Sequence, residues 1–151
     1  GMAVACAAAW PDDCDALITE SAQAFVEDRT LQGIRVAKLS FARPGQLDRL
    51  RKYHGDKAAW VLQAWTETWL APDFAAWNLD DALRQVRCPL LVLHGDRDEF
   101  GSPRHPERIA ALAAGPVAKH VWEGYGHVPH RENAAAMTAL ASSWLDTATA
   151  G

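Results

Sequence analysis

Residues 88–99, CPLLVLHGDRDE, decide the fold of this chain. They hold a continuous apolar run, residues 90–93, between Pro89 and Gly95. An apolar run of this length, bounded by proline and glycine, is typical of a strand buried on both faces, as the strands of parallel sheets are. A polar loop, residues 96–99, follows at once. We therefore predict a central parallel strand whose carboxyl end carries titratable side chains.

The segments on either side of this strand extend the pattern. Downstream, residues 102–114 predict a helix with Ser102 as its cap, residues 117–124 a strand, and the alanine-rich residues 132–148 a helix. Upstream, residues 2–10 predict a helix and residues 15–22 a strand. Helices and strands that alternate with short links indicate a parallel sheet covered by helices. The predicted fold class is α/β, with a short parallel sheet of about three strands.

Residues 25–81 have a different character. Three helical patterns, at 31–42, 45–55 and 56–71, are separated by glycine and proline. We predict a helical cap, or lid, at 25–81, inserted into a core made of residues 1–24 and 82–151. Four tryptophans fall within this segment, namely Trp60, Trp65, Trp69 and Trp77. They can form a core seam of the cap, or Trp60, Trp65 and Trp69 can contact a substrate in an apolar pocket.

The composition excludes several classes of partner. The chain has 151 residues, of which 49% are hydrophobic and 23% charged, and its net charge is −4. These values are ordinary for a globular domain, and they give no basic surface for nucleic acid. No apolar run approaches the length of about 20 residues that a membrane span needs. We expect neither a nucleic-acid partner nor a membrane span.

The cysteines indicate a reducing compartment. Cys6, Cys14 and Cys88 are odd in number and form no C-x-x-C pair. A disulfide framework or a structural zinc site is therefore not expected. We predict reduced thiols in a cytoplasmic protein, with Cys6 and Cys14 as small buried side chains.

Two predicted strands end in loops with titratable groups. Asp98 follows the strand at 90–94, and His127 follows the strand at 117–123, one β-α-β unit later. In a parallel sheet the carboxyl ends of neighbouring strands share one rim. We therefore expect Asp98 to lie within hydrogen-bond distance of His127. A carboxylate that binds one imidazole nitrogen leaves the other nitrogen free to act as a general base.

Other roles for these loops remain open. Asp96 or Asp98 can act only as a turn residue that binds backbone amides, and Asp96 is also a second candidate for the acid. His94 fits a structural or pocket-lining role, and we expect His130 to bond locally or cap the last helix. These four residues and His127 could also form a nitrogen and oxygen metal site, which would make a metal-dependent hydrolase. No H-E-x-x-H spacing supports that reading.

The order of these motifs resembles a known family. A strand, HGDRDEFGSP, a helix, a strand, GYGHVPHRE and a helix resemble the C-terminal half of an α/β-hydrolase-fold serine hydrolase. Asp98 stands third after Gly95, as the acid commonly does in that family, and His127 follows the G-x-G of Gly124 and Gly126. The segments AFVEDRTLQGIRVA and AWTETWLAPDFAAWNL resemble caps of bacterial carboxylic-ester hydrolases. The resemblance implies a Ser-His-Asp triad, a small apolar ester substrate, and no cofactor or metal.

One element of the family is missing. The chain holds no G-x-S-x-G sequence around any of its serines, which are Ser21, Ser40, Ser102, Ser142 and Ser143. Its start, GMAVACAAAW, resembles the helix that follows the nucleophile. We therefore expect the serine to come from outside this sequence, and an in-frame G-x-S-x-G upstream would test this.

Without the serine, we expect the isolated chain to be inactive. The strand at 15–22 would lack a neighbour on one side, which favours either self-association or binding of the N-terminal half of a hydrolase. The alternative function is a truncated, non-catalytic hydrolase that acts as an oligomerising or binding module.

Overall fold

A computed structural model describes residues 1–149 and divides the chain into two compact units. The first unit contains Gly1–Phe25 and the chain from Asn78 onward, and the second is Val26–Trp77. The sequence predicted the second boundary after Asp81, four positions later than the structure places it.

Residues 78 and 79 belong to the first unit for a physical reason. Asn78 forms an isolated antiparallel bridge with Phe25, and the Leu79 N–H donates a hydrogen bond to the Ala24 carbonyl at 2.8 Å. The chain leaves the first unit after residue 25 and returns to it at residue 78, and these interactions hold the two segments together. Both Ala24 and Leu79 are buried.

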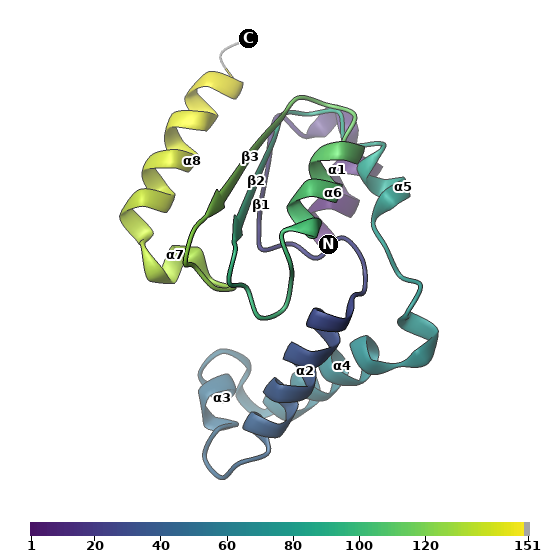
Figure 1. Ribbon diagram of the computed structural model, residues 1–151, viewed down its shortest axis with the longest axis vertical. Helices are drawn as coiled ribbons and strands as arrows, with labels where there is room; N and C mark the ends of the chain where they lie inside the picture. Colours follow the sequence, from purple (N-terminus) through teal and green to yellow (C-terminus); the bar gives the residue numbers. More distant parts are fainter. Residues whose placement is uncertain (150–151) are drawn as a thin grey trace. The chain divides into compact units, whose positions relative to one another are not determined.

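The first unit is built on a three-stranded parallel sheet, as the sequence predicted (Figure 1). Its strands are β1 (Leu17–Glu20), β2 (Leu90–Gly95) and β3 (Val117–Trp122), in the order β1-β2-β3. Leu90 pairs with Leu17 on one side and with Val117 on the other. All six residues of β2 are buried, which fits its continuous apolar sequence.

Helices cover the sheet from two sides. Helices α1, α5 and α6 lie beside one face and α8 beside the other (Figure 1). The bounds of the helices in this unit are α1 Met2–Ala9, α5 Asp80–Leu83, α6 Arg104–Leu112, α7 Pro129–Glu132 and α8 Ala134–Ala148. A 3-10 turn, Pro11–Asp13, follows α1. No helix within residues 1–149 has both the length and the apolar composition to cross a membrane.

Two helix starts differ from the sequence prediction. Helix α6 begins at Arg104, and Pro103 occupies the capping position that was expected for Ser102. The single helix expected at 132–148 is broken at Asn133. The extended backbone of Asn133 stops α7, and its side chain accepts a hydrogen bond from the Ala136 N–H at 3.0 Å to cap α8.

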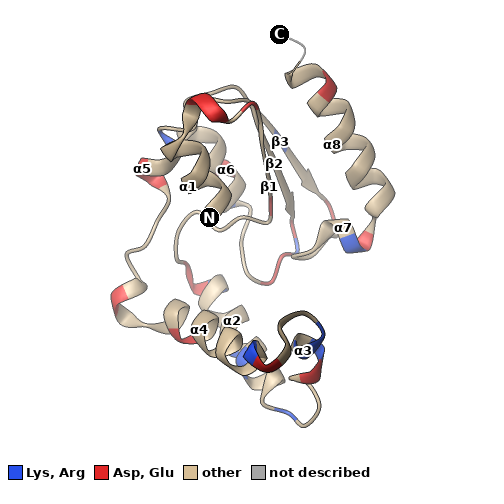
Figure 2. Cartoon of the chain, turned by 180° about the vertical axis from the view of Figure 1, so that it is seen from behind, with Lys and Arg blue, Asp and Glu red and all other residues tan. Residues whose placement is uncertain are grey.

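Helix α8 is only partly covered by the described residues. No residue of α8 is buried, and Leu145 is 36% exposed. Asp146 is its single charged residue, so the helix is almost entirely tan in Figure 2. A helix with so few charges is usually covered by other parts of a protein.

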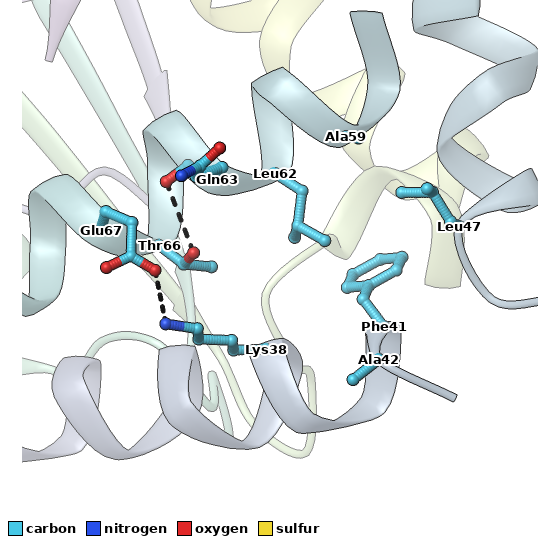
Figure 3. A pocket seen from close by; sticks show the side chains of 9 residues that line it. All are labelled: Lys38, Phe41, Ala42, Leu47, Ala59, Leu62, Gln63, Thr66 and Glu67. Atoms are coloured by element: carbon cyan, nitrogen blue, oxygen red, sulfur yellow. Dashed lines mark hydrogen bonds and ion pairs between the residues drawn. The ribbon is translucent and has the colours of Figure 1, made fainter. Parts of the chain in front are cut away.

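The second unit is helical. Its elements are α2 (Asp28–Phe41), α3 (Asp48–His54) and α4 (Ala58–Leu70), with 3-10 turns at Gly55–Lys57 and Pro72–Phe74. An ion pair between Lys38 and Glu67 links α2 to α4. Beside this pair lies a pocket of about 320 Å³, which Figure 3 shows with Phe41, Leu47 and Leu62 on its apolar side.

The three tryptophans proposed to contact substrate differ in their surroundings. The ring of Trp69 packs edge-on against Phe74 and Trp77, each at a centroid distance of 5.3 Å, so it takes part in a core seam of the second unit. Trp65 is half-buried. Trp60 is 66% exposed and is therefore the most accessible of the three.

The burial predicted for two cysteines was wrong. Cys6 is exposed and Cys14 is half-buried, whereas Cys88 is buried. Helix α1 buries Val4 and Ala7, and a residue two positions after Val4 points away from that buried face.

Candidate active site

Asp98 and His127 meet at the carboxyl ends of β2 and β3. The Nδ1 atom of His127 lies 3.0 Å from Oδ1 and 2.9 Å from Oδ2 of Asp98. The Asp98 side chain is completely buried, whereas that of His127 is 32% exposed. Because an ionised carboxylate only accepts hydrogen bonds, Nδ1–H is the donor. The imidazole therefore presents its other nitrogen, Nε2, for proton transfer.

Neighbouring groups hold both members of the pair. The Phe100 N–H donates to Asp98 Oδ1 at 2.7 Å, and the Phe100 ring packs edge-on against the His127 ring at 4.8 Å. His94 is buried, with Nε2 at 3.0 Å from the Gly101 carbonyl oxygen and 3.9 Å from Asp98 Oδ2. His94 therefore supports the loop that carries Asp98, in line with the structural role predicted for it.

Gly95 allows the two loops to approach closely. A Cβ atom at this position would stand 2.3 Å from the Tyr125 carbonyl oxygen and 2.4 Å from that of Gly126. The Arg97 N–H donates to the same Tyr125 oxygen at 2.9 Å. The loop after β3 is thus packed directly on the end of β2, and this contact brings His127 to Asp98.

Asp96 has a different task from Asp98. Its Oδ1 accepts a hydrogen bond from the Gly124 N–H at 2.7 Å, and its own N–H donates to the Trp122 carbonyl at 3.0 Å. Gly124 has a φ of 84°, which glycine adopts without strain. Asp96 therefore fastens the turn after β3, which is the structural role that the sequence left open.

Glu20, at the end of β1, is a part of this rim that the sequence reasoning missed. It accepts a hydrogen bond from the His130 N–H at 2.8 Å, and its second oxygen lies 2.7 Å from His130 Nδ1. The expectation that His130 bonds locally was therefore wrong, because Glu20 is 110 positions away. The only available signal was that Glu20 stands near the end of a predicted strand of the same sheet.

The connection between Glu20 and His130 spans the rim. Strand β2 lies between β1 and β3, so the chain that leaves β3 must pass the end of β2 to reach Glu20. The His127–His130 segment is thereby fixed at both ends. Ser21, which follows Glu20 at the end of β1, has a φ of 47°. Its buried Oγ has no hydrogen-bond partner within residues 1–149. Backbone strain of this kind in a non-glycine residue is often found at active sites and ligand-binding sites.

The electrostatics of the site favour protonated His127. Burial of the imidazole by itself lowers the pKa of His127, but the hydrogen bond and charge of Asp98, with smaller contributions from Glu99 and Glu20, outweigh it and raise this pKa. The pair is therefore arranged to stabilise an imidazolium ion. Within residues 1–149, no three His, Cys, Asp or Glu side chains converge as metal ligands.

The chain matches no model of a known protein family, and a search of the curated proteins finds no match either. Solved structures do match. A membrane phospholipase A, a bacterial virulence factor, is 19% identical with a TM-score of 0.75; the alignment covers 99% of this chain and 55% of that one. For NosK from Streptomyces actuosus the identity is 23%, the TM-score 0.70, and the coverage 97% and 64%.

A meta-cleavage product hydrolase from Pseudomonas fluorescens IP01 is 16% identical with a TM-score of 0.67, and the alignment covers 97% of this chain and 61% of that one. These structures are α/β-hydrolase-fold enzymes. The chain therefore has part of the α/β-hydrolase fold, and it spans 55–64% of the length of these three structures.

Titration of His127 by NMR tests the electrostatics of the pair. We expect the pKa of His127 to lie above the ordinary value of 6.5 in the intact chain. In Asp98→Asn the hydrogen bond and charge that do most to raise the pKa of His127 are lost and burial remains, so this pKa should fall relative to that of the intact chain. Asp146→Asn, which removes an exposed carboxylate from α8, is the matched control and should change nothing.

The same shift predicts a pH dependence of stability. The folded-state pKa of His127 exceeds its unfolded value, so protonation favours the folded chain. The stabilisation is complete below pH 6.5 and is lost as the pH rises through the folded-state pKa. Urea unfolding at a series of pH values measures it. An Asp98→Asn chain with the same pH dependence as the original would contradict this assignment.

Proposed function

We propose that this chain carries the acid and base of a serine hydrolase that cleaves carboxylic esters, with Asp98 as the acid and His127 as the base. The contact between His127 Nδ1 and the buried Asp98 carboxylate carries the proposal. The chain has no G-x-S-x-G, so the nucleophilic serine is proposed to lie outside these 151 residues. The partial α/β-hydrolase fold of the chain supports this reading.

The proposed reaction has two steps. In the first, Nε2 of His127 takes the proton of the serine hydroxyl while the serine oxygen attacks the ester carbonyl, and the same nitrogen then gives the proton to the leaving alcohol. In the second, His127 takes a proton from water while the water oxygen attacks the acyl carbonyl; the bond to the serine oxygen then breaks, the carboxylic acid leaves, and His127 returns the proton to the serine. Asp98 holds the ring and stabilises the imidazolium in both steps.

We propose the helical unit Val26–Trp77 as the cap. Its exposed or half-buried aromatic side chains would contact the apolar part of a small ester. Trp60 and Trp65 are better suited than Trp69, because Trp69 already packs against Phe74 and Trp77. If Trp60 contacts the substrate, Trp60→Ala should raise KM for short nitrophenyl esters more than it lowers kcat.

The decisive experiment extends the chain. The coding sequence upstream of residue 2 would be read for a G-x-S-x-G and expressed in frame with residues 2–151, and hydrolysis of short nitrophenyl esters would be measured. We expect turnover that depends on His127. An upstream sequence without this motif, together with an extended protein that cleaves no ester, would contradict the proposal.

A second candidate function is a non-catalytic module that associates through its surfaces. Two observations favour it: β1 pairs only with β2 within residues 1–149, and α8 is poor in charge and unburied. An unpaired strand edge presents free N–H and C=O groups that favour pairing with another chain. Ester hydrolysis by the extended protein would support the hydrolase, and its absence would support the non-catalytic module.

Association of the isolated chain follows from the free edge of β1. We expect a homodimer or larger oligomer by sedimentation at low micromolar concentration. The N–H groups of Leu17 and Ser21 bind β2, so by alternation those of Ile18 and Glu20 point to the free edge. Ile18→Pro removes one free donor and keeps the bonds to β2, and it should shift the protein toward monomer.

A conservative substitution at the same position is the control for the prediction of association. Ile18→Val retains the N–H and a β-branched side chain, so it should associate like the original. A folded monomer for the unchanged chain at these concentrations would contradict the free-edge argument.

A further inference from the structure

The two cysteines that lie before β1 and β2 form a pair. Cys14 precedes β1 and Cys88 precedes β2, and their Sγ atoms are 3.5 Å apart, with the Cys88 thiol donating a hydrogen bond to Cys14. Both are free thiols. The sequence gives no hint of this contact, because 74 positions separate the two residues.

The surrounding backbone holds the pair in place. The Leu17 N–H donates to the Pro89 carbonyl at 2.9 Å, which joins the two strand starts directly beside the thiols. A Cβ atom on Gly115 would stand 2.2 Å from the Arg87 carbonyl oxygen and 2.5 Å from that of Cys88, so the backbone at Cys88 is tightly packed. The sulfurs, 3.5 Å apart, would have to approach by about 1.5 Å to reach the length of a disulfide bond.

We propose that Cys14 and Cys88 are a modification site at which a peroxide forms a reversible disulfide that fastens β1 to β2. The partly exposed Cys14 is the thiol that meets the oxidant, and the buried Cys88 resolves the product. The site lies in the first unit, and the proposal does not depend on the hydrolase function.

The chemistry balances in two steps. The Cys14 sulfur attacks hydrogen peroxide, the O–O bond breaks, and a sulfenic acid and one water form. The Cys88 sulfur then attacks the sulfenic sulfur, the S–S bond forms, and a second water leaves with the Cys88 proton. The two thiols lose two electrons and two protons in all, and the peroxide is reduced to two waters.

The environments of the two thiols support this division of roles. Burial, together with the hydrogen bond to Cys14, raises the pKa of Cys88 to about 11, so Cys88 remains a protonated thiol at neutral pH. Burial and protonation disfavour attack of the Cys88 sulfur on peroxide in solution, whereas the Cys14 sulfur lies only 3.5 Å away once it has been oxidised. Cys14 is half-buried and thus open to solvent on one side. The Cys14 sulfur becomes an electrophile, which the Cys88 sulfur can attack, only after Cys14 has been oxidised to the sulfenic acid.

The disulfide would stabilise the first unit and leave the candidate active site unchanged. It closes a loop that contains the whole helical unit Val26–Trp77, and long loops gain most from closure. The cysteines lie at the amino ends of the strands and the Asp98–His127 pair at the carboxyl ends, roughly 20 Å apart along a six-residue strand. Stability should therefore change on oxidation, whereas the titration of His127 should not.

Peptide mapping after peroxide treatment tests the proposal. The purified chain, treated with hydrogen peroxide and digested without reductant, should give a cross-linked peptide that contains Cys14 and Cys88. The melting temperature should rise by about 5 to 10 °C and return after treatment with dithiothreitol. Cys6→Ser should behave like the original chain, and Cys14→Ser should lose both the cross-link and the shift.

Three outcomes would overturn the proposal. The first is a cross-link through Cys6, within or between chains. The second is a Cys14 that proceeds to sulfinic acid while Cys88 stays reduced. The third is a Cys14–Cys88 disulfide that leaves the melting temperature unchanged or lower. Cys88→Ala is the companion variant. If its loss of buried packing prevents folding, the peptide map and melting temperature of the unchanged chain, compared with those of Cys14→Ser, still decide between these outcomes.

Discussion

Replacement of His127 by alanine is expected to lower kcat/KM for ester hydrolysis by about 10⁴-fold or more in the extended protein that carries the serine. Under the proposed mechanism the loss is large because Nε2 of His127 is the group that takes the serine proton. Asp98→Asn should cost a similar factor, since an amide can hold the wrong imidazole tautomer. Initial rates with short nitrophenyl esters measure both variants.

The isolated chain provides the second arm of this experiment. If the nucleophile and the oxyanion donors lie outside this sequence, as proposed, its ester hydrolysis should equal the background, and His127→Ala should change nothing. His54→Ala, at an exposed histidine of α3, is the matched control and should retain the activity of the extended protein.

One outcome would relocate the nucleophile. Turnover by the isolated chain that disappears in His127→Ala would place a nucleophile within these 151 residues. A fluorophosphonate probe followed by peptide mapping would identify it, and Ser21 is the first position to inspect because its Oγ is buried without a partner and its φ is 47°. An adduct on Ser21 would contradict the proposal that the serine lies elsewhere.

Gly95→Ala should strongly destabilise the first unit. Its Cβ would meet the Tyr125 and Gly126 carbonyl oxygens at 2.3 Å and 2.4 Å, and both are backbone atoms that cannot rotate away. Relief requires the loop after β3 to move off the end of β2. We expect a loss of about 3 to 5 kcal/mol in the free energy of unfolding, and separation of His127 from Asp98 in the molecules that still fold.

Gly126→Ala is the matched control for this prediction. A Cβ there would meet its nearest atom, Glu132 Oε1, at 3.4 Å, and that atom ends a flexible side chain. Urea unfolding should show at most a small change for Gly126→Ala. Equal stability of the two variants would show that the close approach at Gly95 is not what holds the loops together.

Local sequence patterns were sufficient for the strands and for the two candidate catalytic residues. The run at 90–93 predicted β2 because four consecutive apolar side chains fit a strand that is covered on both faces. Asp98 and His127 were identified from their positions after predicted strands and from the family spacing. These features depend on residues close together in the chain, which is why the sequence reveals them.

The tertiary structure shows why Asp98, as expected, and not the second candidate Asp96 meets His127. Asp96 and Asp98 are two positions apart and have the same chemistry, yet Asp96 binds the Gly124 amide and Asp98 binds the imidazole. The difference arises from the direction of each side chain after the strand ends. That direction is fixed by the packing of the following loop on Gly95, which no local pattern encodes.

The partners of Glu20 and Cys14 also required the folded chain. Glu20 reaches His130 across 110 positions, and Cys14 reaches Cys88 across 74. Both contacts exist because parallel strands bring their ends together, the carboxyl ends on one rim and the amino ends on the other. The identity of a residue near a strand end does not indicate which residue will face it, because the order and register of the strands determine that contact.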